Sequence, residues 1–122
     1  MTNRETALYI ANQLDEKKAS DVTIRDISAK SGFADFFVIA TAHSLRQLAS
    51  LCTELDDRLS SEDVLVKHIE GRGDSGWILM DYGDIIVNLF TEEQRNHYQV
   101  EKIWNDCERI EYKTFNLHSV RF

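Results

Sequence analysis

Apolar positions recur with helical spacing in three stretches of the chain: residues 4–18, about 44–60, and the stretch after Thr91. They follow the i, i+3, i+4, i+7 pattern that turns one face of a helix towards a core. The positions expected to face the core are Ala7, Ile10, Ala11 and Leu14 in the first helix, Leu45, Leu48, Cys52, Leu55 and Leu59 in the second, and Val100, Ile103 and Trp104 in the third. Each helix also has a Ser or Thr cap with Glu or Gln three residues later. These pairs are Thr2 with Glu5, Ser44 with Gln47, and Thr91 with Gln94.

Between the helices the pattern changes to that of β-strands. The five predicted strands cover residues 22–27, 36–40, 64–69, 77–80 and 85–90. The first alternates apolar and polar positions, as a half-buried strand does, whereas 36–40 is apolar throughout, as in a central strand covered on both faces. The last two are joined by Asp81-Tyr-Gly-Asp84, where Gly83 can adopt the positive φ of a tight hairpin turn.

The element order is therefore α-β-β-α-β-β-β-α. This order predicts an α/β (α+β) fold, a mixed five-stranded sheet with helices packed on it. The chain has 122 residues, no proline and no low-complexity tract, so nothing in it marks a linker. We expect one domain over residues 1–106, followed by a short tail over residues 107–122.

No segment indicates a membrane or a secretory route. The start, Met1-Thr-Asn-Arg-Glu, leads into a charged periodic segment without the apolar core of a secretory signal. The longest uninterrupted apolar run, around Phe36 to Ala40, is far short of the ~20 residues that span a bilayer. Cys52 and Cys107 show neither paired spacing nor a metal pattern, so we expect reduced thiols and a cytoplasmic protein.

The charge balance narrows the class of partner. Lys and Arg number 14 against 21 Asp and Glu, which gives a net charge of -7. Nucleic acid and anionic lipid are bound through clustered Lys and Arg, so this balance disfavours both. We expect a basic protein partner, no membrane and no direct specific binding of nucleic acid.

Two motifs resemble nucleotide or metal sites but are explained more simply by turns. Gly71-Arg-Gly-Asp-Ser-Gly76 has the G-x-G-x-x-G spacing, yet a strand rather than a helix follows it, and Asp74 would repel a phosphate. Asp81 and Asp84 could hold a divalent cation only from one common face. Their spacing instead puts them on opposite sides of a turn, where Asp is common.

The histidines do not form a metal-binding pattern. They are His43, His68, His97 and His118. None has a second ligand three or four residues away on a helix, so a zinc site would have to be assembled entirely by the fold. The sequence predicts no metal and no cofactor.

Aromatic residues gather in the second half of the chain, among carboxylates. The aromatic residues are Trp77, Tyr82, Phe90, Tyr98 and Trp104, and the acidic ones are Asp81, Asp84, Glu92, Glu93 and Glu101. Aromatic residues are usually part of the core, and Phe90 and Trp104 fit that role. Trp and Tyr are also enriched in interfaces, where a rim of carboxylates selects a basic partner. The pattern alone does not decide whether these aromatic residues form part of the core or a partner-binding surface.

Several short motifs, spread over about residues 4–106, agree in order and spacing with those of one known family. The first group is Ala34-Asp-Phe-Phe-Val-Ile-Ala-Thr41 followed by Ser44-Leu-Arg46-Gln47. The second is Glu70-Gly71, Gly76-Trp77-Ile-Leu, Asp81-Tyr-Gly-Asp84-Ile-Ile-Val87, Phe90, Arg95, Tyr98 and Glu101-Lys-Ile-Trp104. These resemble the A-D-Y-F-V-I…S-x-R-Q and E-G…W-x-L-x-D-x-G-D-x-V-V-H-x-F…R-x-x-Y-x-L-E-x-x-W patterns of the ribosomal silencing factor (Iojap-related) family.

The resemblance implies a non-enzymatic factor whose α/β fold is similar to that of nucleotidyltransferases, without their catalytic carboxylate arrangement. Members of the family bind the large ribosomal subunit through a protein on its subunit-joining face, the one numbered fourteen. They block the small subunit sterically and so repress translation under nutrient limitation, and free members tend to form homodimers. The chain departs from the family at Asn88, where His is usual, and Asn can form hydrogen bonds but cannot titrate.

The resemblance thus points to a partner-binding surface and to no catalytic residues. The residues expected on this surface are Trp77 and Tyr82 as apolar anchors, Asp81 and Asp84 as a charged rim, and Asn88 and Tyr98 along the same surface. Two alternatives stay open. One is a divergent nucleotidyltransferase that uses Asp81 and Asp84 with magnesium, and the other is a generic dimeric adaptor.

Overall fold

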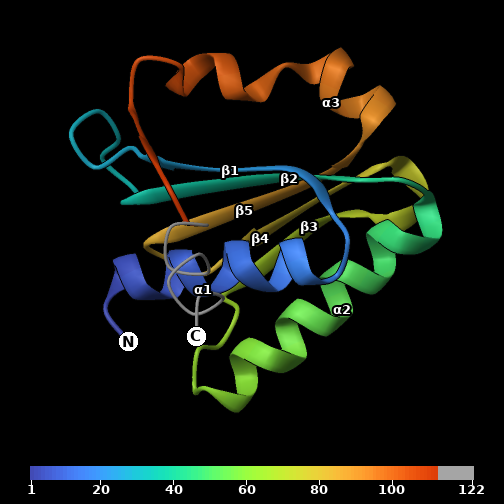
Figure 1. Ribbon diagram of the computed structural model, residues 1–122, viewed down its shortest axis with the longest axis horizontal. Helices are drawn as coiled ribbons and strands as arrows, with labels where there is room; N and C mark the ends of the chain where they lie inside the picture. Colours follow the sequence, from blue (N-terminus) through green and yellow to red (C-terminus); the bar gives the residue numbers. More distant parts are fainter. Residues whose placement is uncertain (113–122) are drawn as a thin grey trace, which may run out of the picture.

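The computed structural model describes residues 1–112, apart from the side chains at positions 72–73 and 100–101. Figure 1 shows three layers, with one sheet between two sets of helices. Helices α1 (Asn3–Glu16) and α2 (Leu45–Ser61) cover one face, called here the helical face. Helix α3 (Glu92–Tyr98) and the 3₁₀ helix η2 (Val100–Trp104) form a strap across the other, called here the strap face.

The sheet has six strands, in the spatial order β3-β4-β5-β2-β1-β6. Their bounds are β1 Ser20–Asp26, β2 Phe36–Ala42, β3 His68–Arg72, β4 Trp77–Asp81, β5 Ile85–Thr91 and β6 Glu108–Ile110. Strands β2 and β5 are parallel, with Phe36 opposite Ile85, and the other neighbouring strands are antiparallel. The sheet is therefore mixed, as predicted, but the prediction of five strands is wrong.

The strand that the sequence missed is β6, at the edge of the sheet beside β1. It has three residues, and two of them, Glu108 and Arg109, are exposed charges, so neither length nor alternation marks it in the sequence. Ile110 lies opposite Ile24 of β1, and Tyr112 beyond it is buried. Residues 107–112, assigned above to the tail, thus belong to the folded unit, whereas 113–122, with His118, lie outside the described residues.

The helical face carries the larger core. The predicted stripe and capping box of α1 are both confirmed, and every residue of β2 is buried. In α2 the cap at Ser44 is confirmed and Leu48, Leu55 and Leu59 are buried. Leu45 was expected there but is 49% exposed, because it opens the helix ahead of the stripe that meets the sheet. Leu51 takes part in that stripe in its place.

The predicted third helix is correct at its start and wrong at its end. Thr91 caps α3 by accepting the Gln94 N–H at 3.4 Å. The helix stops at Tyr98 because Gln99 adopts a left-handed conformation, with φ of 50°. The chain continues as η2, where Trp104 is half-buried and Ile103 is 61% exposed instead of facing the core.

The Gly71–Gly76 segment and the Gly83 turn both connect neighbouring strands. Strand β3 begins at His68, later than the predicted strand at 64–69. The Gly71–Gly76 segment joins β3 to β4 through the short 3₁₀ helix η1 (Gly73–Ser75), so it connects two strands as predicted. Between β4 and β5, Gly83 has φ of 89°, which confirms the predicted hairpin. None of the helices in residues 1–112 is long and apolar enough to cross a membrane.

Candidate functional site

Alternation along β4 decides which predicted residues can share a surface. Trp77 faces the strap, and since side chains of a strand alternate between the two faces, Leu79 and Asp81 do as well. Ile78 and Met80 belong to the core on the helical face, and so does Tyr82. The structure therefore separates Trp77 from Tyr82, the two residues expected to act together as anchors.

Three residues meet around Trp77: Asn88, Phe90 and Tyr98. Together with Trp77 they are called here the Trp77 cluster. The indole Nε1–H of Trp77 donates to Asn88 Oδ1 at 3.0 Å, and the Trp77 ring stacks on Phe90 with centroids 6.3 Å apart and an interplanar angle of 21°. The Tyr98 ring completes the cluster, 6.3 Å from Trp77 and 5.9 Å from Phe90. Three of the six predicted site residues are thus brought together.

Exposure within the Trp77 cluster increases outwards. Phe90 is fully buried and Asn88 is 4% exposed, whereas Trp77 is half-buried and Tyr98 is 54% exposed. The buried amide of Asn88 satisfies the one polar group of the indole, so the rest of that ring system behaves as an apolar surface. The cluster therefore presents aromatic area to solvent on a fixed base.

Helix α3 brings Tyr98 to the cluster, and its start is tied to the start of β4. The Thr91 N–H donates to the Gly76 carbonyl at 3.0 Å. Gly76 has φ of 84°, and a Cβ there would lie 2.7 Å from Cγ of Gln94, so only glycine fits this approach. Beside the cluster, an open hollow of about 560 Å³ is lined by α3 residues Glu93, Gln94, Asn96, His97 and Tyr98.

Asp81 and Asp84 belong to the hairpin turn and not to the Trp77 cluster. Asp81 Oδ1 accepts the Gly83 N–H at 2.7 Å, and the Asp84 carbonyl accepts the N–H groups of Asp35 and Phe36. The turn lies at the other end of β4 from Trp77, about 13 Å away for four residues of strand. Asp81 stabilises the turn itself, which is the simpler explanation given above for this pair.

Among the side chains that the structure describes, no three from His, Cys, Asp or Glu come together as metal ligands.

Tyr82 is a core residue, which corrects its predicted role as an exposed anchor. Its side chain is 8% exposed, and its hydroxyl donates to Asp56 Oδ1 of α2 at 3.0 Å. Burial, together with this hydrogen bond and the nearby Asp56 charge, raises the pKa of Tyr82 far above its usual value. The tyrosine thus anchors the hairpin to α2 instead of facing a partner.

Two residues next to the cluster were not singled out from the sequence. His97 packs edge-on against Tyr98, with ring centroids 5.1 Å apart, and Leu79 is half-buried beside the apolar layer of the strap face. Alternation from Trp77 could have identified Leu79. No sequence signal marks His97, because its position depends on where α3 ends.

Comparison with known proteins agrees with this architecture. Residues 1–121 match the family described as "Ribosomal silencing factor during starvation". The chain is 32% identical over 111 residues to a ribosomal silencing factor of Halalkalibacterium halodurans, covering 91% of this chain and 95% of the relative. It is 33% identical over 106 residues to that of Bacillus subtilis, covering 86% and 90%.

Solved structures show the same fold. A crystal structure of a Chromobacterium violaceum protein superposes with a TM-score of 0.81 at 26% identity, covering 85% of this chain and 87% of that one. One from Bacillus halodurans gives 0.75 at 32% identity, covering 89% and 99%. The match over nearly the whole length shows that the chain belongs to the ribosomal silencing factor family.

Proposed function

We propose that this protein is a ribosome anti-association factor. It binds the large subunit through the ribosomal protein numbered fourteen, sterically blocks the small subunit and represses translation under nutrient limitation. Membership of the family supports ribosome-associated regulation, a regulatory rather than a catalytic role. In this proposal the protein acts in the cytoplasm without a cofactor and forms a homodimer when free. The likeness of the fold to nucleotidyltransferases stays a prediction.

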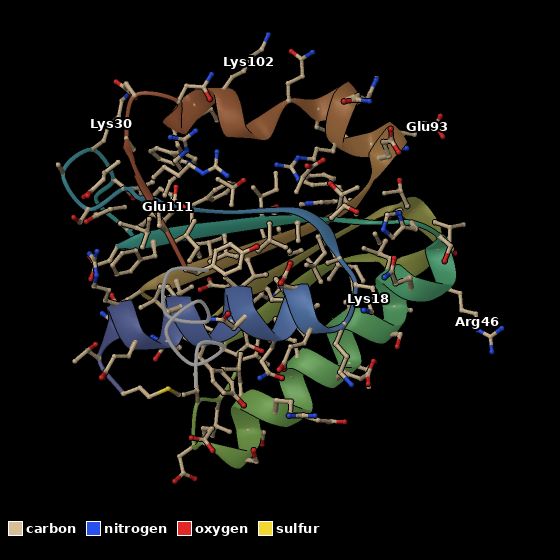
Figure 2. All side chains as sticks on the ribbon, in the orientation of Figure 1. Lys18, Lys30, Arg46, Glu93, Lys102 and Glu111 are labelled. Atoms are coloured by element: carbon tan, nitrogen blue, oxygen red, sulfur yellow. The ribbon has the colours of Figure 1, made fainter. Side chains whose placement is uncertain are left out.

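The observation that carries the proposal is the Trp77 cluster. Interfaces are enriched in Trp and Tyr that are partly exposed before binding, and a few such residues supply most of the binding energy. Glu93 extends outwards from α3 beside the cluster (Figure 2). With a net charge of -7, this setting suits a basic protein surface such as that of a ribosomal protein.

The test is sedimentation of purified ribosomal subunits on a sucrose gradient with the wild-type protein and with Trp77→Ala. We expect the wild type to migrate with the large subunit and to reduce subunit joining. Trp77→Ala should weaken binding by about 2 kcal/mol, roughly thirtyfold, because an aromatic anchor is lost. Trp104→Phe is the matched control, since Trp104 packs on Phe33 and Phe37 at the other end of the strap.

One outcome would contradict the proposed function, and a second would contradict the role of Trp77 in it. If wild-type protein stays at the top of the gradient and joining is unaffected, the protein is not an anti-association factor, and the generic dimeric adaptor becomes the better explanation. If Trp77→Ala lowers folding stability but binds normally per folded molecule, Trp77 is only a structural residue. Calorimetric titration with nucleotide and magnesium tests the nucleotidyltransferase alternative, which requires heat that Asp81→Asn abolishes.

A further inference from the structure

Helix α3 carries the exposed ring of the Trp77 cluster without a core of its own. It has seven residues, and none of them is buried. Its start is held by the Thr91 cap, but a cap fixes only the first turn. The direction of the helix, and with it the position of Tyr98, must therefore be set by another contact.

Arg95 makes that contact. It lies three residues before Tyr98, so both side chains come from neighbouring positions on the helix surface. One guanidinium nitrogen, Nη1, donates to the backbone carbonyl of Asp21 at 2.7 Å and to Thr41 Oγ1 at 2.8 Å. Asp21 belongs to β1 and Thr41 to β2, so a single side chain ties α3 to two neighbouring strands.

The local structure of the sheet makes both acceptors available to Arg95. The register of β1 against β2 shifts between Ser20 and Thr23, and Asp21 within this irregularity has φ of 48°, which costs free energy for a residue other than glycine. Thr41 is 4% exposed, so its hydroxyl needs a hydrogen-bond partner inside the protein, and Arg95 provides one. Thr41 also lies opposite Phe90, a member of the Trp77 cluster, so the hydrogen bonds of Arg95 lie next to that cluster.

We infer that Arg95 is a positioning residue, whose bonds to Asp21 and Thr41 hold α3 at the angle that puts Tyr98 beside Trp77. This role is structural and does not depend on what the cluster binds. Its effect on ribosome binding rests on the proposed function.

The test reads the position of Tyr98 directly. The chain has two tryptophans, so protein labelled with ¹⁵N-tryptophan gives two indole N–H signals, which a Trp104→Phe variant assigns. In Arg95→Met we expect the Trp77 signal to shift, because the Tyr98 ring moves away from it, and the Trp104 signal to stay. Binding to the large subunit should weaken about tenfold, because α3 must then be held in its binding position without the charged hydrogen bonds of Arg95.

Matched variants separate positioning from charge and from unfolding. Lys102→Met removes a positive charge from the same strap, where Lys102 points away from the sheet (Figure 2), and should change neither signal nor binding. Arg95→Lys keeps the charge on a shorter side chain without the planar guanidinium, and should restore the signal only in part. If Arg95→Met does not fold, Thr41→Val removes the buried acceptor at similar shape and should shift the Trp77 signal in the same direction.

The outcomes distinguish this inference from the proposed function. A Trp77 signal at the wild-type position in folded Arg95→Met or Thr41→Val would overturn the inference. A shifted signal together with weakened binding supports both. A shifted signal with normal binding supports the role of Arg95, and if Trp77→Ala also binds normally, the Trp77 cluster is not the binding surface. If the wild type itself does not bind the large subunit, the proposed function fails while the inference about Arg95 stands.

Discussion

The two faces of the sheet share the same strands but are covered in different ways. On the helical face, aliphatic side chains such as Ile10, Leu48 and Leu59 are fully buried beneath α1 and α2. On the strap face, the layer includes the half-buried rings of Trp77 and Trp104, and Tyr98 above it is 54% exposed. One face therefore supplies most of the hydrophobic stabilisation, while the other keeps aromatic area available to a partner.

The covering elements explain this difference. Helices α1 and α2 have 14 and 17 residues, long enough for stripes of four or five buried residues each. Helix α3 has seven residues and none buried, and the strap turns sharply at Gln99. A short strap cannot shield the whole face of the sheet from solvent. The strap face therefore combines hydrogen bonds, such as those of Arg95 and Asn88, with partly exposed rings.

The largest effect is expected from a substitution on the helical face. Leu48→Ala leaves a cavity in a fully buried position and should lower the free energy of unfolding by about 3 kcal/mol. Leu45→Ala is the matched control, because Leu45 lies on the same helix but is 49% exposed, and should cost less than about 0.5 kcal/mol. Urea unfolding measures both.

The same pair tests whether the two faces have separate roles. Once corrected for the folded fraction, large-subunit binding by Leu48→Ala should equal that of the wild type. A loss of binding by the folded molecules would show that the helical face also contributes to recognition, and the division drawn above would be wrong.

The helical face was also the easier one to predict. Caps and regular apolar stripes in the sequence predict its helices, and an unbroken apolar run predicts β2. The strap was mispredicted because its end depends on the conformation of one residue, Gln99, which no local pattern marks. Strand β6 was missed because three residues with two exposed charges pair only where β1 offers an edge.

The candidate site was predicted in part for a related reason. Trp77, Asn88 and Tyr98 meet, but only the fold brings Tyr98 from α3 to the sheet. The separation of Tyr82 from Trp77 could have been foreseen, since positions 77 and 82 have opposite parity in a strand that continues into a tight turn. Trp77 and Tyr82 were assigned to one surface because they are close in sequence, although strand alternation places them on opposite faces of the sheet.

Tyr82→Phe tests that separation and should have an intermediate effect. Loss of the hydrogen bond to Asp56 should lower the free energy of unfolding by about 1 kcal/mol, while the ring still fills its place. Because Tyr82 lies on the helical face, binding to the large subunit should not change. Weakened binding by this variant would return Tyr82 to the partner surface.

The variant should also alter the response to alkaline pH. The native state keeps the Tyr82 proton because the pKa of Tyr82 is raised, whereas an unfolded tyrosine ionises near pH 10. The unfolded state is therefore favoured as pH rises above 10, and stability falls. Urea unfolding at pH 8.5 and 11 should show a shallower fall in Tyr82→Phe. Part of the fall should persist through Tyr112, because burial and Asp15 raise the pKa of Tyr112 to about 12.

The smallest effect is expected from the carboxylates of the hairpin turn. Asp84→Asn removes an exposed charge some distance from the Trp77 cluster, so it should weaken binding by about 0.5 kcal/mol at low salt and by nothing measurable at high salt. Asp57→Asn, an exposed charge on α2, is the control for net charge alone. If the two variants behave alike, the protein is attracted to its partner by overall charge, and the hairpin turn is not part of the rim. A salt-dependent loss confined to Asp84→Asn would extend the partner surface from the Trp77 cluster along β4 to the hairpin turn.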